Sequence, residues 1–243
     1  MGADGSPGAA AAPWRAAAAQ VLVADLATAQ PDDDTAHHLR RVLRLRAGEV
    51  VCAADGAGGY RLCRMGADGG LEPDGGIGRV PAPDVELAVG FAPVKADRPE
   101  WVVQKLTELG IDRILVLATA RSVVRWDGER RVRHLDKLRR VAREAAQQCR
   151  RLWLPSIEWS DFDTVAAAGV LADAGGRPLR DGDHLVLVGP EGGWAAEERE
   201  GRELVALGEH VLRAETAALV AGSAMASLRL GLTRSDLPSS HPE

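Results

Sequence analysis

The sequence predicts an α/β protein with a small β-rich domain at the N-terminus, followed by a larger domain that is built on a mostly parallel sheet. Two patterns predict this division. Short apolar runs separated by Gly and Asp turns fill residues 50–77, which is typical of hairpins or a small barrel. From residue 85 onward, apolar runs of strand length alternate with amphipathic helical patterns, which is typical of a parallel sheet. Pro81 and Pro83 mark the predicted boundary near residue 82.

In the first domain, the Ala- and Gly-rich residues 1–19 are predicted to be a poorly ordered leader. The segment 36–45 is predicted to be a helix, because Leu39, Val42 and Leu43 fall on one helical face. Four short apolar runs are predicted to be strands: Gln20–Leu26, Val50–Ala54, Tyr60–Met65 and Leu71–Ile77.

In the second domain, apolar runs predict five strands: Val85–Phe91, Ile111–Leu117, Ile157–Trp159, Leu185–Val188 and His210–Leu212. Amphipathic patterns and capping residues predict five helices: Asp97–Leu109, Arg130–Arg151, Thr164–Ala168, Ala196–Leu207 and Glu215–Leu230. The longest of these helices is predicted to bury the stripe Leu135, Leu138, Ala142, Ala145 and Cys149. This order of strands and helices favours a parallel sheet with helices on its faces.

The composition favours a globular cytoplasmic protein. With 243 residues, of which 46% are hydrophobic, the chain can bury a core of its own. Its apolar stretches are interrupted by charged residues before they reach membrane-spanning length, and the N-terminus is a poor match to a signal peptide. Three cysteines without CxxC spacing (Cys52, Cys63 and Cys149) fit a reducing compartment and predict no structural disulfide.

Positive charge is concentrated in one part of an otherwise acidic chain. The formal net charge is −5, yet residues 120–151 carry 11 basic and 4 acidic side chains. A solvated helix face would normally balance its charges better, so this excess favours a surface that binds nucleic acid or phosphate.

The run His184–Trp194, HLVLVGPEGGW, places a glycine-rich turn directly after a buried strand. Glycines lack a Cβ and allow a ligand to approach the main chain, and open α/β sheets bind ligands at the carboxyl ends of their strands. An ordinary tight turn has the same composition, so the turn alone leaves both interpretations open.

Several common catalytic signatures are absent from the sequence. It contains no GxxxxGK[ST] loop, no GxGxxG fingerprint and no GxSxG elbow. The histidines have no metal-ligand spacing with a cysteine or carboxylate, so we expect no metal.

Four segments together resemble one known family. They are HHLRRVLRLRAGE (37–49), KADRPEWVVQKLTELGI (95–111), LVGPEGGW (187–194) and LGEHVLRAETA (207–217). In order and spacing they resemble the RsmE family of the SPOUT methyltransferase superfamily, over residues 20–232. The last two segments are the more specific pair, and the first two separate RsmE from other SPOUT enzymes.

The resemblance implies a fold, a reaction and partners. It implies a PUA-like β-barrel that binds RNA at 20–82, a SPOUT domain with a deep trefoil knot at 83–235, a tail at 236–243, and a homodimer. It implies transfer of a methyl group from S-adenosylmethionine to the N3 atom of one uridine in 16S rRNA, free or in the small ribosomal subunit. The cofactor-binding residues that it implies are Leu117, Thr119, Val188, Gly189, Gly192, Gly193, Leu207, Gly208, Val211, Leu212, Arg213 and Thr216.

Uridine N3 carries a proton, so methylation requires its loss or the stabilisation of negative charge on the ring. Arg213 is a candidate to bind the target phosphate or stabilise that charge, and Glu144 or Glu191 to accept the proton. Glu191 is more simply interpreted as a carboxylate that fixes the turn by accepting its amides, and Glu144 as a partner of a neighbouring arginine. Proton loss to water remains open.

The candidate RNA-binding residues in the first predicted helix are Arg40, Arg41 and Arg44. In the basic segment they are three arginines that match polar positions of the family's motifs: Arg121, Arg125 and Arg151. Two other functions fit the same sequence. One is a SPOUT ribose 2′-O-methyltransferase acting on tRNA or rRNA, which would lack the HHLxxVLR segment. The other is a non-catalytic RNA-binding factor for ribosome assembly, which the intact cofactor loops disfavour.

Overall fold

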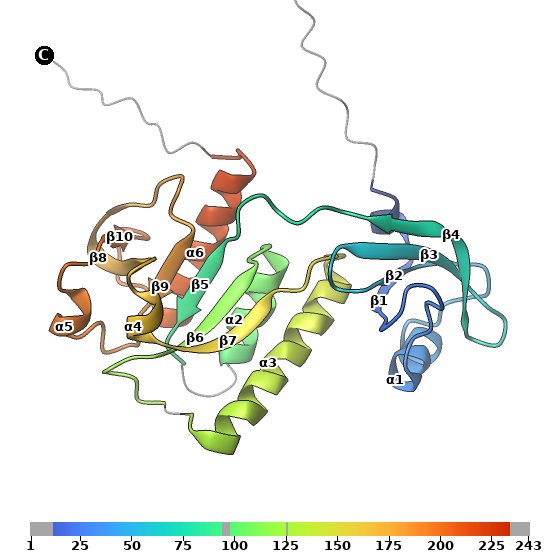
Figure 1. The fold of residues 1–243 in the computed structure, drawn as a ribbon, viewed down its shortest axis with the longest axis horizontal. Coiled ribbons are helices and arrows are strands. Elements are labelled where there is room, and N and C mark those ends of the chain that lie inside the picture. The colour runs from blue at the N-terminus through green and yellow to red at the C-terminus, as the bar shows by residue number, and fades with distance from the viewer. Residues whose placement is uncertain (1–11, 94–97, 125, 234–243) are drawn as a thin grey trace, which may run out of the picture. The chain divides into compact units, whose positions relative to one another are not determined.

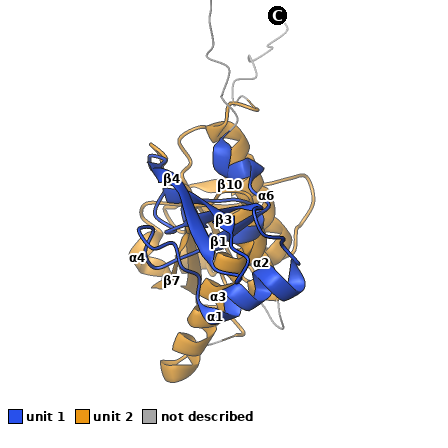
Figure 2. Cartoon of the chain, turned by 90° about the vertical axis from the view of Figure 1, so that its right-hand side faces the viewer, with its two compact units in different colours: residues 1–82, 146–153 blue, residues 83–145, 154–243 orange. Residues whose placement is uncertain are grey.

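The computed structural model describes residues 12–93, 98–124 and 126–233. The chain forms two compact units (Figure 2). The first comprises residues up to Ala82 together with Ala146–Trp153, and the second comprises Pro83–Ala145 and the chain from Leu154 onward. The division between residues 82 and 83 falls in the Pro-rich segment. Residues 146–153, which the sequence places in the second domain, fold with the first unit.

The first unit is built on a small sheet whose strand order is β1-β2-β3-β4. Its strands are β1 (Ala19–Leu22), β2 (Val50–Ala54), β3 (Gly59–Met65) and β4 (Leu71–Arg79). β1 runs parallel to β2, whereas β2, β3 and β4 are antiparallel neighbours joined by the predicted Gly/Asp turns. Among the described residues, β4 does not pair with β1 to close a barrel.

Two N-terminal segments differ from the prediction. Pro13–Ala16, predicted to be leader, forms a 3-10 helix whose Trp14 ring lies 4.9 Å from that of Tyr60. The predicted helix 36–45 begins earlier, as α1 (Asp33–His37), and continues as a π-helical turn over His38–Val42. The wider turn rotates the apolar stripe out of register, so Val42 is 61% exposed instead of buried.

Residues 146–153 join the first unit through polar contacts. The Gln20 side-chain amide donates to the carbonyl oxygens of Ala146 (3.2 Å) and Arg151 (2.8 Å). The Leu22 amide donates to the side-chain oxygen of Gln147 (2.9 Å). Gln20 is buried away from water, so without these two carbonyl oxygens its side-chain N–H groups would have no hydrogen-bond partner.

The second unit is built on a parallel sheet with the strand order β10-β8-β9-β5-β6-β7 (Figure 1). Its strands are β5 (Ala88–Phe91), β6 (Arg113–Ala118), β7 (Ser156–Asp161), β8 (Val170–Pro178), β9 (Leu185–Val188) and β10 (Leu204–Ala206). The helices are α2 (Arg98–Glu108), α3 (Gly128–Gln148), α4 (Phe162–Val165), α5 (Ala196–Arg199) and α6 (Ala214–Arg229). The predicted parallel α/β architecture is confirmed, and β9 has the predicted bounds.

Two predictions in the second unit are wrong, and one strand was not predicted. The helix predicted over 196–207 ends at Arg199, and Leu204–Ala206 is strand β10. The strand predicted at 210–212 is a loop. Strand β8 was not predicted, because its Ala, Asp and Gly residues form no apolar run and only two of its nine residues are buried. These elements lie at one edge of the sheet, where pairing with neighbouring strands outweighs local propensity.

Gly176 of β8 allows β10 to approach closely. A Cβ atom on Gly176 would lie 2.4 Å from the backbone of Leu204, whereas one on Gly175 would meet nothing closer than 3.6 Å. We expect Gly176→Ala to lower the free energy of unfolding by about 2 kcal/mol, measured by denaturant unfolding, because the clash is with backbone. Gly175→Ala, the matched control, should change it by less than about 0.5 kcal/mol. Equal stabilities would contradict the close pairing of β8 with β10.

The described residues contain no helix that is long and apolar enough to cross a membrane. They also contain no group of three His, Cys, Asp or Glu side chains arranged to hold a metal ion. Cys52, Cys63 and Cys149 are free thiols. Burial raises the pKa of the Cys52 thiol to about 12, so this thiol stays protonated at neutral pH.

Candidate functional site

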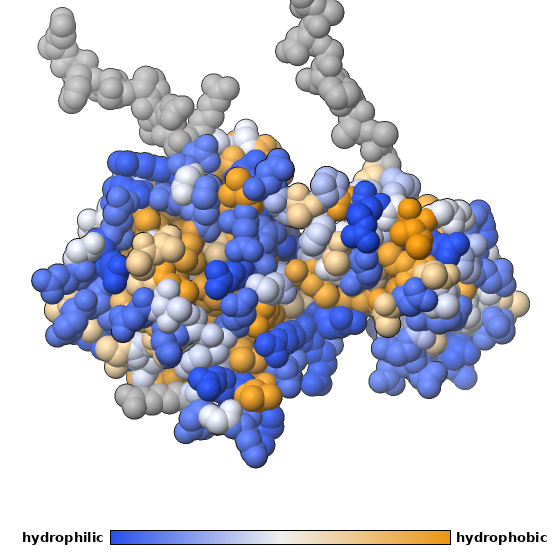
Figure 3. Space-filling view, in the orientation of Figure 1, coloured by the Kyte–Doolittle hydropathy of each residue, from blue (hydrophilic) through white to orange (hydrophobic). Residues whose placement is uncertain are grey.

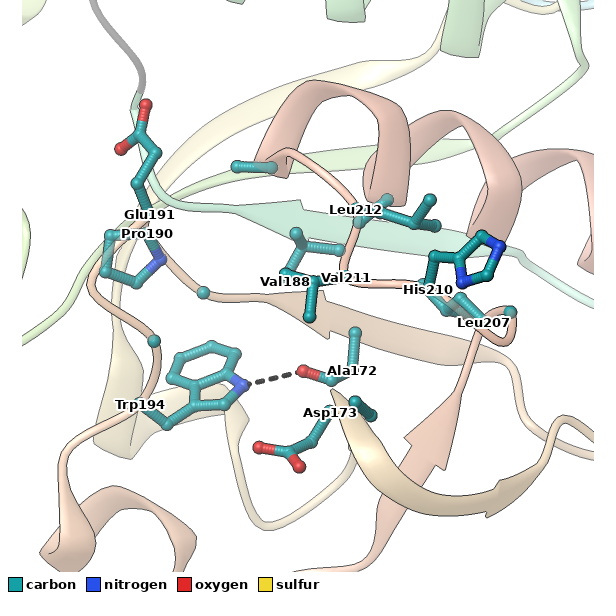
Figure 4. A pocket seen from close by; sticks show the side chains of 16 residues that line it. Ala172, Asp173, Val188, Pro190, Glu191, Trp194, Leu207, His210, Val211 and Leu212 are labelled. Atoms are coloured by element: carbon teal, nitrogen blue, oxygen red, sulfur yellow. Dashed lines mark hydrogen bonds between the residues drawn. The ribbon is translucent and has the colours of Figure 1, made fainter.

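A pocket of about 270 Å³ opens at the carboxyl ends of β9 and β10, beside the middle of β8 and the start of α6 (Figure 4). Val188 at the end of β9 lies opposite Ala172 of β8, so the turn after β9 emerges beside residues at which β8 continues. The loop that follows β10 forms another wall. This edge of a parallel sheet is where ligands commonly bind in α/β proteins.

Seven of the twelve predicted cofactor-binding residues line this pocket. They are Val188, Gly189, Gly193, Leu207, Gly208, Val211 and Leu212. The fold therefore brings the glycine turn and the loop after β10 to one cavity. Gly193 has a φ of +67°, a conformation that favours glycine at the end of the turn.

The other five predicted residues do not line the pocket. Gly192, Arg213 and Thr216 neighbour lining residues in sequence, whereas Leu117 and Thr119 belong to β6 and the loop after it, from which no residue lines the pocket. Leu117 is fully buried in the core at the end of β6. The Thr119 hydroxyl lies 2.7 Å from that of Ser122 in the loop after β6. Gly192 is exposed in the turn, and Arg213 and Thr216 are exposed at the start of α6.

Nine further lining residues are not among the predicted cofactor-binding residues: Ala172, Asp173, Ala174, Pro190, Glu191, Trp194, His210, Ala214 and Ala217. Three of them come from β8, which gave no sequence signal. Ala214 and Ala217 could have been inferred, because residues three apart at the start of a helix share a face. Asp173 is held by an ion pair with Arg199 (3.4 Å).

Trp194 forms one wall and connects two strands. Its indole N–H donates to the carbonyl oxygen of Ala172 (3.0 Å), as Figure 4 shows. The ring is 5% exposed and packs against Phe162, with centroids 5.2 Å apart. A Cβ atom on Gly189 would lie 3.0 Å from the indole, so a glycine there allows the ring to lie against the turn. Trp194 thus fixes the turn relative to β8.

We expect Trp194→Phe to keep the packing of this wall but lose its hydrogen bond to Ala172. The free energy of unfolding should fall by about 1 kcal/mol, the usual net contribution of one such bond. The affinity for S-adenosylmethionine, the cofactor that the resemblance implies, should fall several-fold in titration calorimetry, because β8 is no longer bonded to the Trp194 side chain. Trp101→Phe is the matched control, because Trp101 lies on α2 and is 42% exposed. Equal losses in the two variants would contradict a specific role for the indole N–H.

Glu198, not Glu191, is the carboxylate that fixes the loops around the turn. It is 8% exposed, and its two oxygens accept from the amides of Ala120 and Ala195, each at 2.8 Å. This links the loop after β6 to the start of α5, where a Glu at the third position often accepts from the capping residue. The Arg121 guanidinium adds a second link, because it donates to the Gly192 carbonyl (3.1 Å).

The prediction that Glu191 accepts amides of the turn is wrong. Its side chain is exposed and points away from the cavity (Figure 4), and no described residue donates to its carboxylate. The other candidate base, Glu144, is exposed on α3 and does not line the pocket. Within the described residues Glu144 forms no ion pair, so its predicted pairing with an arginine is also wrong.

Comparison with known proteins supports one family. A sequence model described as an RNA methyltransferase domain matches residues 81–226. The ribosomal RNA small subunit methyltransferase E of Mycobacterium bovis is 33% identical over 83% of this chain and 87% of its own length. The chain belongs to the ribosomal RNA small subunit methyltransferase E family.

Other members and related structures agree with this assignment. Ribosomal RNA small subunit methyltransferase E of Bacillus subtilis is 28% identical over 82% of this chain and 90% of its own length. A crystal structure of a probable rRNA methyltransferase from Porphyromonas gingivalis has a TM-score of 0.74 and is 27% identical, covering 88% of this chain and all of the other. A methyltransferase from Legionella pneumophila, solved with bound SAM, has a TM-score of 0.71 and is 25% identical, covering 82% of this chain and 91% of the other.

The family's PUA model matches residues 31–70 of the first unit. This range contains three predicted RNA-binding residues, Arg40, Arg41 and Arg44, and all three are exposed. Arg40 is partly engaged, because its guanidinium donates to the carbonyl oxygens of Ala36 (3.3 Å) and Asp68 (3.4 Å). Arg41 and Arg44 have no ion pair with any residue that the structure describes.

The remaining predicted RNA-binding residues lie in different places. Arg121 is beside the turn, and Arg151 is half-buried in the segment that joins the first unit. Arg125 lies outside the described residues.

In the methyltransferase domain, α3 carries most of the basic segment. Figure 3 shows hydrophilic side chains over this helix. His134 stacks on Trp126, with ring centroids 4.3 Å apart. Burial, helped by the charge of Arg130, lowers the pKa of His134, so the positive charge of the helix at neutral pH comes from its arginines and lysine.

Proposed function

We propose that this protein transfers the methyl group of S-adenosylmethionine to the N3 atom of a uridine in 16S rRNA. One observation supports this most strongly: a chain of the ribosomal RNA small subunit methyltransferase E family carries a pocket between the glycine turn and the loop after β10. Two of its neighbours in fold and sequence, from Porphyromonas gingivalis and Legionella pneumophila, are described as methyltransferases, and the second contains SAM.

The residues present fit this cofactor. Gly189 and Gly208 line the cavity with main chain, and a Cβ on Gly208 would meet nothing within 4 Å, so a ligand has direct access to the backbone there. Val188, Leu207 and Leu212 supply apolar surface suited to an adenosyl group. Polar groups for the amino-acid end would come from main-chain amides and from the Asp173 and His210 side chains.

When bound, S-adenosylmethionine supplies an electrophilic methyl group, and the protein must present a uracil to it. Arg213 lies next to the lining residue Ala214, and its exposed guanidinium has no partner among the described residues. A guanidinium is suited to hold a phosphate of the target nucleotide or to stabilise negative charge on the uracil oxygens. It does not accept the N3 proton, because it stays protonated.

The proton on N3 has three candidate destinations: Glu144, Glu191 or water. Glu191 lines the pocket, but its carboxylate points away from the cavity. Glu144 could accept it only if the RNA approaches across α3, because this carboxylate is not among the lining residues. Release to water requires no side chain and fits an exposed rim. We propose release to water, with catalysis resting on the positioning of donor and uracil.

The test is to incubate the protein with labelled S-adenosylmethionine and either 16S rRNA or small ribosomal subunits, and to map the modified atom by mass spectrometry. We expect 3-methyluridine at one position. A ribose methyl group would instead identify a 2′-O-methyltransferase. Failure to bind S-adenosylmethionine at millimolar concentration in titration calorimetry would favour a non-catalytic assembly factor.

We further propose that the protein acts as a homodimer in the cytoplasm and that its second unit contains the trefoil knot implied by the resemblance. Val211, at the rim of the pocket, is 91% exposed, and an apolar side chain at that position is suited to burial against a second copy. Light scattering after size-exclusion chromatography should give twice the chain mass of 25.7 kDa. A monomer at micromolar concentration would contradict the dimer.

A further inference from the structure

A second cavity, of about 450 Å³, lies between α3 and the start of β7 in the methyltransferase domain. Its walls include Arg139, Arg143, Leu154, Pro155, Ser156 and Glu158. We refer to it as the α3–β7 groove. No residue of this groove lines the pocket between the glycine turn and the loop after β10. It is therefore a separate feature of the same unit.

The groove carries uncompensated positive charge. Arg143 is exposed and has no hydrogen bond or ion pair with any described residue. Arg139 lies one helical turn earlier on the same face, and like charges four residues apart destabilise a helix slightly. The acid in the groove, Glu158, is already paired with Arg113 (3.2 Å). Arg139 is paired with Asp136 (2.9 Å), so Arg143 carries the uncompensated charge, which an anionic ligand would neutralise.

The groove also has groups with fixed positions. The Arg139 guanidinium donates to Asp136 (2.9 Å) and to the carbonyl oxygen of Ile157 (3.2 Å), so the structure holds it across the groove. The Ser156 hydroxyl is exposed and can donate a hydrogen bond. Two guanidinium groups beside a hydroxyl are typical phosphate ligands.

The position of the groove indicates an extended ligand. Two strands, β5 and β6, separate β7 from β9, and the groove is at the amino end of β7 whereas the pocket is at the carboxyl end of β9. The groove and the pocket are therefore about 14 Å apart across the sheet, which is three strand spacings. Along the strands they are about 20 Å apart, which is the length of the six residues of β7. A single nucleotide in the pocket cannot reach that far, whereas a polynucleotide can.

We propose that the α3–β7 groove binds phosphate groups of the RNA substrate, several nucleotides away from the methylated uridine. This inference rests on the proposed function and adds an anchoring site to it. Arg143 is the principal ligand, Arg139 a pre-oriented second one, and Ser156 a hydrogen-bond donor. The contact is to the RNA backbone and independent of base sequence.

The experiment measures binding of in vitro transcribed 16S rRNA to the full chain at several salt concentrations. We expect Arg143→Ala to raise the dissociation constant about tenfold at low salt and to reduce the slope of log affinity against log salt by about 0.7–0.9, one phosphate contact. Arg143→Glu should weaken binding further, and Arg143→Lys should recover most of the affinity. The loss should appear in KM for RNA, while the dissociation constant for S-adenosylmethionine, measured without RNA, stays the same.

Arg180→Ala is the matched control, because Arg180 is exposed in the same unit, in the loop before β9, and should leave the salt slope unchanged. Thermal melting of each variant reports on folding. If the wild-type protein binds and methylates RNA while Arg143→Ala and Arg143→Glu match its affinity and salt slope, the groove proposal is overturned and the proposed function stands. If the wild-type protein neither binds nor methylates RNA, the proposed function itself fails.

Discussion

Arg213→Ala should reduce methyl transfer to 16S rRNA by about 100-fold or more and leave the fold intact. Loss of one group that stabilises developing charge typically costs this much in rate. The side chain is exposed at the N-terminus of α6 and has no described partner, so the free energy of unfolding should change by less than about 0.5 kcal/mol. Single-turnover methylation with saturating S-adenosylmethionine measures the first effect, and denaturant unfolding measures the second.

Arg213→Lys distinguishes the shape of the guanidinium from its charge. Lysine keeps the charge but cannot make two parallel hydrogen bonds, so we expect only partial recovery of the rate. Arg202→Ala is the matched control, because Arg202 follows α5 and has no ion pair with described residues. Full activity of Arg213→Ala would refute the assigned role.

Glu198→Ala should cause the largest loss of stability. It removes the two charge-assisted hydrogen bonds that link Ala120 to Ala195 and leaves both amides without these acceptors. We expect the free energy of unfolding to fall by about 3 kcal/mol. For a chain of this size that corresponds to a melting temperature about 6–12 °C lower. Affinity for S-adenosylmethionine should fall too, because the loop after β6 loses its link to Ala195 and keeps only the Arg121–Gly192 hydrogen bond to the glycine turn.

Glu197→Ala is the control for this prediction. Glu197 is the preceding residue on α5 and is exposed, so its removal should change stability by less than about 0.5 kcal/mol. If calorimetry gives the same melting temperature for both variants, the hydrogen bonds of Glu198 to Ala120 and Ala195 do not stabilise the fold as we expect.

The sequence by itself determined the elements whose local pattern is strong. Strand β9 is a continuous apolar run, and α3 repeats its small and apolar residues at helical spacing, so both were predicted from nearby residues alone. The division after residue 82 follows from a change in composition together with Pro81 and Pro83. The glycine turn and the loop after β10 were identified because their residue types suit a ligand bound by main chain.

The tertiary structure decided what depends on partners distant in sequence. Strand β8 has no apolar run and is a strand only because β9 and β10 pair with it, so its three pocket residues could not be predicted. Glu191 and Glu198 are both acids after the same strand, and only burial of Glu198 between two loop amides separates their roles. The periodicity of apolar residues predicts which side chains are buried. Hydrogen-bond partners, in contrast, depend on how segments distant in sequence pack together.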